Sequence, residues 1–295
     1  MISKKQFDLL VELKRRDRDF SQRELAQAAG MSIGMVNKLL GEFTDGGLLA
    51  GKRLSDAGYA ALEPFRVKKA VILAAGFGSR LVPITLNTPK PLVRVKGRCI
   101  IQTLLSALTA AGITDITIVR GYLGEQFDQL RYSFPSIRFV ENPAYLESNN
   151  ISSAYCVRYE MQRAYVCEAD LYVQNPSVIT EYQYASNYLG VPTEKTDDWC
   201  FSVSGGYIRR MAIGGEHCYH MFGISYWTDE DGARLADRIK SVYESPGGKE
   251  RYWDQVALEY YLPEFRVAVR ECTFDDIVEI DTFSELKRFD PTYDV

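Results

Sequence analysis

The chain has 295 residues, a hydrophobic fraction of 46% and a charged fraction of 25%, which are ordinary values for a folded protein of about two domains. This composition excludes a disordered chain, a collagen-like repeat and a disulfide-rich scaffold. No stretch reaches the roughly 20 apolar residues of a membrane helix, and charges interrupt the N-terminus too often for a signal peptide. We therefore expect a cytoplasmic protein without membrane insertion.

The net charge of −4 conceals two regions of opposite sign. Residues 1–69 carry 13 lysines and arginines against 9 acidic residues, whereas the remaining residues carry 22 against 30. This split indicates two modules with different partners. The six cysteines show no CxxC spacing and the two histidines are His217 and His220, so we expect neither a zinc site nor a redox pair. Any catalytic metal must then be bound by oxygen ligands.

The first 66 residues have the pattern of short helices joined by turns. Apolar residues recur at helical spacing over residues 4–16, and Ser21 with Glu24 forms a capping-box pattern. Another helix is expected from Ser32. The segment GLLAGKRLSDAGYAAL, residues 47–62, is then expected to form a small wing and a short helix. The sequence predicts a small helical domain over residues 1–66.

This order of elements resembles the winged helix-turn-helix modules of bacterial regulators. The resemblance places Asn37 and Lys38 on the recognition helix. That helix contains no arginine, and the excess positive charge is small for a DNA-binding domain. DNA is therefore an open but unfavoured partner, and a module that packs on its neighbour or forms a homodimer is the alternative.

From residue 67 to residue 295 the pattern changes to alternating strands and helices, which predicts an α/β domain with a mostly parallel sheet and a ligand at the carboxyl ends of the strands. Beyond Trp199 the pattern becomes short strands followed by two helices. The expected strands and helices before that point are, in chain order, the strand 69–76, the helix 99–112, the strand 115–121, the helix 124–134, the strand 136–142, the helix 151–161, the strand 164–173 and the helix 175–186.

The most informative segment is LAAGFGSRLVPITLNTPKPL, residues 73–92, in which a buried strand ends in a glycine-containing turn. Backbone N–H groups in such a turn can face an anion, and Gly76 and Gly78 permit a close approach and an unusual φ. Arg80 and Lys90 supply positive charge for a triphosphate and its leaving pyrophosphate. We expect a phosphate-binding loop here.

Two common phosphate loops do not fit this segment. A dinucleotide-binding loop needs GxGxxG and an acidic residue about 20 positions later, and a Walker loop needs GKS or GKT; neither is present. The pattern AAGxGxR followed by PKxL resembles nucleotide-sugar pyrophosphorylases and related nucleotidyltransferases over residues 69–290. The resemblance implies a Rossmann-like fold with a mixed, mostly parallel sheet. The residues that it assigns to the triphosphate are Leu73, Ala74, Ala75, Gly76, Phe77, Gly78, Ser79, Arg80 and Lys90.

Nucleotidyl transfer needs a divalent cation, and Mg²⁺ takes one or two carboxylates. The segment VCEADLYV places Glu168 and Asp170 at the end of an apolar strand, on one face. In the family an acidic residue late in the chain completes the metal site, and Asp281 matches it better than Glu279. The resemblance therefore implies a magnesium site at Asp170 and Asp281, with Glu168 in place of the family's first acid. The alternative is that Asp281 only caps a helix.

The segment ENPAYLESNNISSAY, which follows the third strand, resembles the bacterial CTP:phosphocholine cytidylyltransferase branch, where an NN(I/V)xS pattern occurs. Asn149 or Asn150 offers both a donor and an acceptor to a cytosine edge. Ser153 belongs to the same candidate nucleotide-binding segment. The alternative is a helix cap rich in Asn and Ser.

A quaternary ammonium group is bound by aromatic faces and carboxylates. Tyr252, Trp253 and Asp254 lie together at a predicted helix start, and the family carries a similar aromatic–acidic step. Glu279 adds charge. We therefore expect these four residues to bind the acceptor. The weaker candidates, which are aromatic residues in predicted strands, are Trp199, Tyr207, Tyr226 and Trp227.

The function that this resemblance implies is transfer of CMP from CTP to phosphocholine, giving CDP-choline and pyrophosphate, with Mg²⁺ as cofactor. Arg80, Lys90, Asp170 and Asp281 are the candidate catalytic residues. One alternative keeps the chemistry and changes the acceptor to 2-aminoethylphosphonate, another small phosphate or a sugar 1-phosphate. A second alternative is a DNA-binding regulator that senses a nucleotide or a choline metabolite.

Overall fold

The computed structural model describes residues 2–16 and 20–294. These residues form two compact units. The smaller unit contains the described residues up to Arg66 together with Tyr182–Tyr184, and the larger unit begins at Val67 and contains the rest. No helix among the described residues has both the length and the apolar composition needed to span a bilayer.

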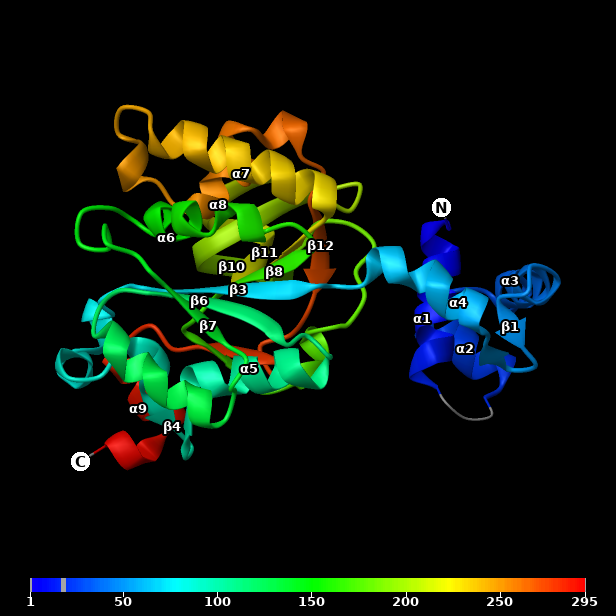
Figure 1. Ribbon diagram of the computed structural model, residues 1–295, viewed down its shortest axis with the longest axis horizontal. Coiled ribbons are helices and arrows are strands. Elements are labelled where there is room, and N and C mark those ends of the chain that lie inside the picture. Colours follow the sequence, from blue (N-terminus) through cyan, green and yellow to red (C-terminus); the bar gives the residue numbers. More distant parts are fainter. Residues whose placement is uncertain (1, 17–19, 295) are drawn as a thin grey trace. The chain divides into compact units, whose positions relative to one another are not determined.

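The smaller unit consists of helices packed with one short hairpin (Figure 1). Its elements are α1 (Lys4–Arg15), α2 (Gln22–Ala28), α3 (Ile33–Asp45), β1 (Leu49–Ala50), β2 (Arg53–Leu54) and α4 (Asp56–Leu62). The capping box predicted before α2 is present, because the Ser21 hydroxyl accepts a hydrogen bond from the Glu24 N–H and the Glu24 carboxylate accepts one from the Ser21 N–H. Ser32 caps α3 in a similar way through the N–H of Met35.

The segment Tyr182–Tyr184 completes the core of the smaller unit, although it lies far along the chain. The Tyr184 ring stacks on Phe65 at 5.2 Å between centroids and lies 5.4 Å from Phe7. The predicted helix over residues 175–186 is therefore wrong: the structure has a short 3-10 turn, Pro176–Val178, followed by irregular chain with one isolated bridge between Tyr182 and Arg66. The tyrosines of this segment pack with residues from the first 66 positions, a long-range contact that outweighs local helix propensity.

The larger unit contains a seven-stranded mixed sheet with the strand order β10-β12-β11-β8-β3-β6-β7. The central strands β8, β3, β6 and β7 are parallel, whereas β11 runs antiparallel to β8. The predicted α/β class with a mostly parallel sheet is confirmed. The bounds of these strands are β3 (Lys69–Ala74), β6 (Asp115–Arg120), β7 (Arg138–Glu141), β8 (Ala164–Glu168), β10 (Asn187–Ser204), β11 (Tyr207–Trp227) and β12 (Ala268–Glu271).

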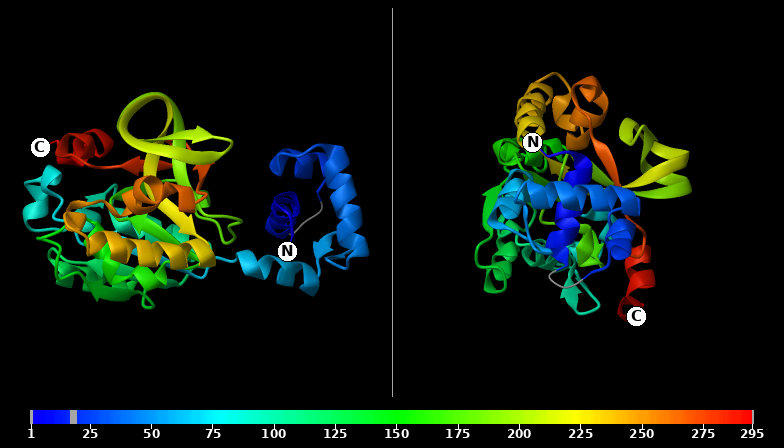
Figure 2. Two further views of the ribbon diagram at one scale, coloured as in Figure 1. Left: turned by 90° about the horizontal axis from the view of Figure 1, so that it is seen from above. Right: turned by 90° about the vertical axis from the view of Figure 1, so that its right-hand side faces the viewer.

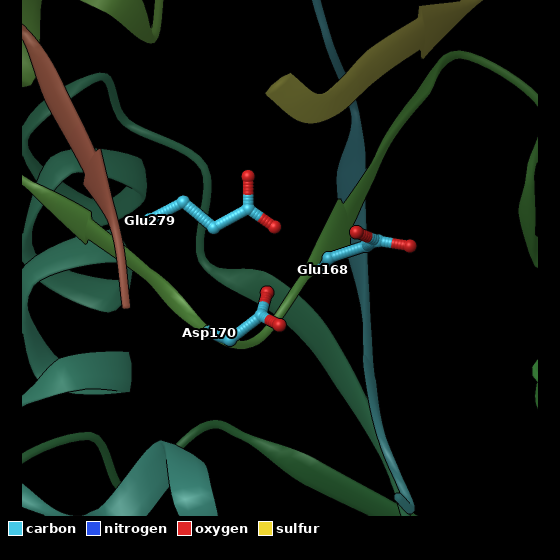
Figure 3. A group of neighbouring side chains, drawn as sticks. All are labelled: Glu168, Asp170 and Glu279. Carbon is cyan, nitrogen blue, oxygen red and sulfur yellow. The ribbon is translucent and has the colours of Figure 1, made fainter. Parts of the chain in front are cut away.

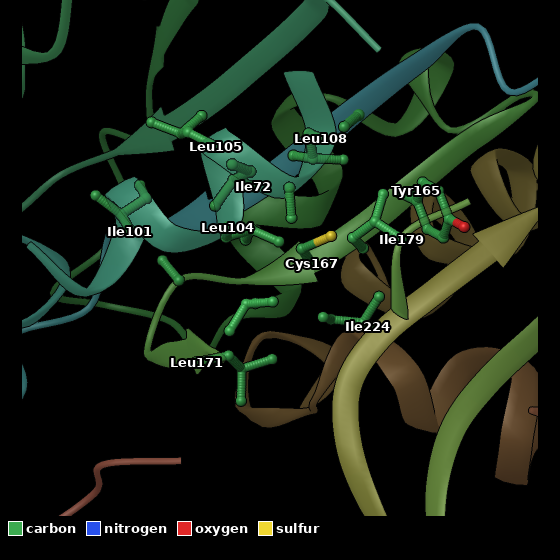
Figure 4. Close-up of a cluster of buried hydrophobic side chains, with 14 of the residues drawn as sticks. Ile72, Ile101, Leu104, Leu105, Leu108, Tyr165, Cys167, Leu171, Ile179 and Ile224 are labelled. Carbon is green, nitrogen blue, oxygen red and sulfur yellow. The ribbon is translucent and has the colours of Figure 1, made fainter. Parts of the chain in front are cut away.

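Helices cover both faces of this sheet (Figure 1). Residues of β3 alternate between two cores: Ile72 packs toward α5 (Ile100–Ala110), whereas Val71 packs on the side of α6 (Ile151–Cys156) and α7 (Asp229–Tyr243). Figure 4 shows the first of these cores, where Leu104 and Leu108 of α5 lie beside Ile72 and Cys167. Both faces of β3 are therefore packed, and the loop that follows it starts from a buried strand end.

Short elements complete the larger unit around the carboxyl ends of the central strands. The predicted strand 164–173 divides after Glu168, and its second half, β9, pairs with β13 in a separate two-stranded sheet. The strands β10 and β11 form a long hairpin whose distal half curls away from the sheet (Figure 2). The remaining elements are β4 (Arg94–Val95), β5 (Arg98–Cys99), β9 (Leu171–Val173), α8 (Trp253–Gln255), β13 (Ile277–Glu279) and α9 (Phe283–Phe289).

Candidate active site

A cleft of about 550 Å³ opens at the carboxyl ends of β3 and β8 in the larger unit. Its volume lies in the range typical of small-molecule sites. Most of the residues predicted for the site line it. The predicted residues among its lining are Leu73, Ala74, Ala75, Gly76, Gly78, Ser79, Arg80, Lys90, Asn149, Asn150, Ser153, Asp170, Tyr252, Asp254, Glu279 and Asp281.

The loop after β3 turns sharply at Gly78, whose φ is +68°. A Cβ at this position would lie 2.9 Å from the Cβ of Lys90, so the glycine lets the loop pack directly on the lysine. Gly76 has open space beside it and no positive φ, so of these two glycines Gly78 is the one that adopts the unusual φ. Phe77 does not line the cleft either, because its ring packs on Tyr122 at 4.3 Å between centroids.

Lys90 joins two acidic residues that lie 111 positions apart. Its ammonium lies 2.8 Å from Oδ2 of Asp170 and 2.7 Å from Oδ1 of Asp281. The same oxygen of Asp281 accepts a hydrogen bond from Arg80 at 2.9 Å. Burial alone would lower the pKa of Lys90, but the charges of Asp170 and Asp281 outweigh it and raise the pKa well above its usual value. The four candidate catalytic residues therefore form one connected group.

Asp170 also belongs to a group of three carboxylates with Glu168 and Glu279, each offering one oxygen within 4.8 Å of the others (Figure 3). Burial raises the pKa of Glu168 and of Glu279, and the charge of Asp170 adds to both shifts. Burial would also raise the pKa of Asp170, but Lys90 outweighs it and lowers this pKa. Oδ1 of Asp170 is buried and has no hydrogen-bond partner among the described residues. A buried carboxylate oxygen without a partner is suited to a cation.

The residues predicted to contact the base form hydrogen bonds mainly with other residues of the protein. The Asn149 N–H donates to the carbonyl oxygen of Lys249 at 2.8 Å, and its side-chain amide donates to the carbonyl oxygen of Glu250 at 3.3 Å. Oδ1 of Asn150 accepts from the N–H of Trp253 at 3.0 Å. The hydroxyl of Ser153 accepts from the amide of Asn142 at 3.0 Å. These residues line the cleft, but their side chains already make internal hydrogen bonds.

On the acceptor side the structure contradicts one prediction. Trp253 has no exposed surface and packs between Tyr188 and Trp227, at 6.2 Å from each ring, so it does not line the cleft. Positions 253, 256 and 257 share one side of the helix, and that side faces the core. The neighbouring residues Tyr252 and Asp254 do line the cleft, as predicted.

Ten further residues line the cleft that the sequence did not place at the site, apart from Glu168 and Trp199, which were weaker candidates: Pro91, Asn142, Tyr145, Ser148, Ser152, Glu168, Ala169, Asp198, Trp199 and Met221. Asp198 and Trp199 lie on β10, and the Trp199 ring meets the Tyr252 ring at 5.5 Å and 67°. Tyr145 lies in the segment after β7 and packs on Gly121, where a Cβ would lie 2.7 Å from the tyrosine ring. Glu168 lies in the cleft and was in doubt because the family's first acid is different. The only sequence signal that could have predicted a contribution of β10 to the cleft is the run of two acids and a tryptophan at 197–199.

With this geometry in view, comparison with known proteins decides the family. The model of the nucleotidyl transferase family matches residues 69–183. The 2-aminoethylphosphonate cytidylyltransferase of Lancefieldella rimae is 37% identical over 228 residues, which cover 76% of this chain and 92% of the relative. The chain belongs to the nucleotidyl transferase family, with cytidylyltransferases as close relatives.

Two further comparisons agree with this membership. The choline-phosphate cytidylyltransferase of Streptococcus pneumoniae is 33% identical over 224 residues, covering 75% of this chain and 96% of the relative. A solved structure of CTP:phosphocholine cytidylyltransferase from Streptococcus pneumoniae superposes with a TM-score of 0.72 at 32% identity, covering 77% of this chain and 99% of that one. About a quarter of this chain lies outside each match, so it carries an additional segment relative to these enzymes.

Proposed function

We propose that this chain transfers CMP from CTP to a small phosphate or phosphonate that carries a cationic amine. The observation that carries the proposal is the charge of the cleft, whose lining holds two cations against six acids. A nucleoside triphosphate is itself strongly anionic, so it needs additional positive charge in this cleft. A divalent cation and a cationic acceptor supply that charge. The six acids are Glu168, Asp170, Asp198, Asp254, Glu279 and Asp281.

We infer that Asp170 and Asp281 would hold a magnesium ion at the phosphate end of the cleft. The unpartnered Oδ1 of Asp170 supports this assignment. Oδ1 of Asp281 already accepts from Lys90 and Arg80, so Asp281 would bind the ion through its other oxygen. When bound, Mg²⁺ neutralises charge on the phosphate oxygens of CTP. Lys90 and Arg80 contribute fixed positive charge beside the same oxygens, which stabilises the charge that develops on the leaving pyrophosphate.

The reaction needs no general base from the protein. A phosphate or phosphonate oxygen of the acceptor attacks the α-phosphorus of CTP, the bond from that phosphorus to the β-phosphate oxygen breaks, and pyrophosphate leaves. The attacking group is already largely ionised near neutral pH, because the second pKa of such groups is about 6. This agrees with the positions of the two histidines, His217 and His220, neither of which lines the cleft. The protein's task is to align the two substrates and stabilise charge.

The amine end favours a primary ammonium, as in 2-aminoethylphosphonate. Glu168, Glu279 and Asp254 offer carboxylate oxygens that can accept its N–H groups. The aromatic side chains there are Trp199 and Tyr252, while Trp253, the third expected aromatic contact, is buried in the core. Phosphocholine, the acceptor expected first from the sequence, becomes the second candidate here, because the inclined rings of Trp199 and Tyr252 suit a quaternary ammonium group.

A pyrophosphate-release assay tests the proposal by crossing the four nucleoside triphosphates with several acceptors. These are 2-aminoethylphosphonate, phosphocholine, phosphoethanolamine and glucose 1-phosphate. We expect CTP to be required and the aminated acceptors to be turned over far better than the sugar phosphate. Turnover confined to glucose 1-phosphate, or none with any aminated acceptor, would contradict the proposal.

For the smaller unit we propose a winged helix-turn-helix module that binds protein rather than DNA. The order of three helices, a hairpin and a fourth helix supports the module. The side chain of Lys38, a candidate DNA contact on α3, lies 3.8 Å from the carboxylate of Glu42, which weakens its attraction for phosphates. In a gel-shift assay with the DNA upstream of its own gene, we expect no specific complex. A specific, salt-sensitive shift would favour the regulator instead.

A further inference from the structure

Asn150 connects two elements that both contribute residues to the cleft wall. Its side-chain Oδ1 accepts a hydrogen bond from the backbone N–H of Trp253, the first residue of α8, at 3.0 Å. Its Nδ2 donates to Oε1 of Glu168, the last residue of β8, at 3.4 Å. One short side chain therefore fixes the position of a helix start relative to a strand end.

The contact with Trp253 determines where the neighbouring side chains point. The N–H groups in the first turn of a helix have no partner within the helix, so an acceptor placed there fixes how the chain enters it. Tyr252 and Asp254, on either side of Trp253 in the chain, both line the cleft. The side chain of Trp253 is fully buried in the core, and its backbone N–H is bound to Asn150. Together these two contacts fix the orientation of the first turn of α8.

The contact with Glu168 acts on a carboxylate that has little freedom. A Cβ at Gly223 would lie 2.5 Å from Oε2 of Glu168, so the glycine backbone bounds this carboxylate on one side. Asn150 holds the other oxygen. The side chain of Asn150 thus links the carboxylate of Glu168 on β8 to the start of α8, which carries Asp254. The distance between these two carboxylates therefore depends on Asn150.

We propose that Asn150 is a positioning residue that sets the acceptor's ammonium site by fixing Glu168 and Asp254 relative to one another, rather than a residue that reads cytosine. This inference rests on the proposed function, because it assumes that the acceptor carries a cationic amine. Loss of the amide removes the discrimination between an aminated acceptor and the same acceptor without its amine. The use of CTP is affected much less.

The test compares kcat/KM for 2-aminoethylphosphonate with that for ethylphosphonate, which lacks the amine. In the wild-type protein we expect the aminated acceptor to be preferred. In Asn150→Ala we expect the ratio to fall about tenfold or more, with the KM for CTP changing about twofold at most. The matched control is Asn175→Ala, which removes an amide that lies outside the cleft lining and donates to Asp276 at 2.6 Å. Its ratio should stay close to that of the wild-type protein.

Asn150→Ser provides a second variant should the alanine variant fail to fold, as judged by circular dichroism. Its shorter, uncharged side chain removes the amide that bonds both Trp253 and Glu168, so the ratio should fall here too. A wild-type preference that survives in these variants, or that falls equally in Asn175→Ala, overturns the role of Asn150 alone. A wild-type protein that shows no preference for the amine overturns the proposed acceptor, and this inference with it.

Discussion

The carboxylate of Glu168 lies directly against the backbone of Gly223, where a Cβ would come within 2.5 Å of Oε2. Gly223 lies within β11, the antiparallel neighbour of β8, so the contact crosses two adjacent strands. We expect Gly223→Ala to displace the carboxylate and to reduce turnover about 100-fold, because small displacements of a site group are costly. Pyrophosphate release under saturating substrates measures this effect.

Gly190→Ala is the matched control for this substitution. Gly190 lies in β10 of the same sheet, and a Cβ there would lie 3.2 Å from side-chain atoms of Tyr219 and Val269, away from the site acids. We expect this variant to lose some thermal stability while keeping most of its turnover. Equal losses of turnover in the two variants would show that crowding within the sheet, and not the position of Glu168, is responsible.

Asp170 is predicted to be essential for turnover and dispensable for folding. Asp170→Ala removes the carboxylate whose Oδ1 has no partner among the described residues, whereas Lys90 retains its 2.7 Å contact with Asp281. We expect turnover to fall by about a thousandfold or more, since the loss affects charge stabilisation in the transition state. Asp281→Ala should behave similarly, with an unchanged circular dichroism spectrum in each case. Near-wild-type turnover in either variant would refute its assignment.

The phosphate loop and the acids around Lys90 could be predicted from the sequence because each lies in a short contiguous motif. The motif fixes Gly78, Arg80 and Lys90 at constant spacing after a buried strand, and parallel strands bring the acid-bearing strand β8 to the same edge. The connection of Lys90 to both Asp170 and Asp281 then follows from the fold. Their roles as metal ligands remain predictions.

Other features depended on contacts that no local pattern contains. Trp253 was expected in the cleft because an aromatic–acidic step looks the same in sequence whichever member faces the core. Asp198 lies on the long hairpin β10–β11, whose path depends on its register and not on nearby residues. The residues 182–184 were assigned to a helix, since only the fold reveals that Phe7 and Phe65 are their partners.

Asp254 should make the stability of the larger unit depend on pH. Burial raises its pKa from 3.8 to about 6, so between these values the folded protein binds more protons than the unfolded chain. The free energy of unfolding should therefore fall as pH rises through this window, by about 3 kcal/mol, and level off above it. Urea denaturation of the wild-type protein and of Asp254→Asn at pH 4 and pH 7 measures this contribution, because the fall in the free energy of unfolding should be about 3 kcal/mol smaller in the variant.

Asp276→Asn is the control with the opposite sign. Burial would raise the pKa of Asp276, but hydrogen bonds from Asn175 and Thr273 outweigh it and lower this pKa. Asp276 therefore stabilises the fold above the carboxyl's ordinary pKa, and this contribution is lost as pH falls. Removing Asp276 should reduce stability more at pH 7 than at low pH. A wild-type profile that Asp254→Asn leaves unchanged would contradict the assignment to Asp254.

Tyr184 should stabilise the smaller unit although it lies outside the first 66 residues. Its ring packs on Phe7 and Phe65, and its hydroxyl donates to the carbonyl oxygen of Ile2 at 3.3 Å. Tyr184→Ala removes these contacts, so we expect a loss of about 2–4 kcal/mol from the smaller unit, seen as faster proteolysis within residues 1–66. Tyr59→Ala is the control, because Tyr59 on α4 is 46% exposed and its loss should cost about 0.5 kcal/mol at most.

By the same reasoning, residues 1–66 expressed alone should be less stable than in the full chain. Equal protection of the isolated segment and the full chain would show that Tyr182–Tyr184 contribute nothing to this core.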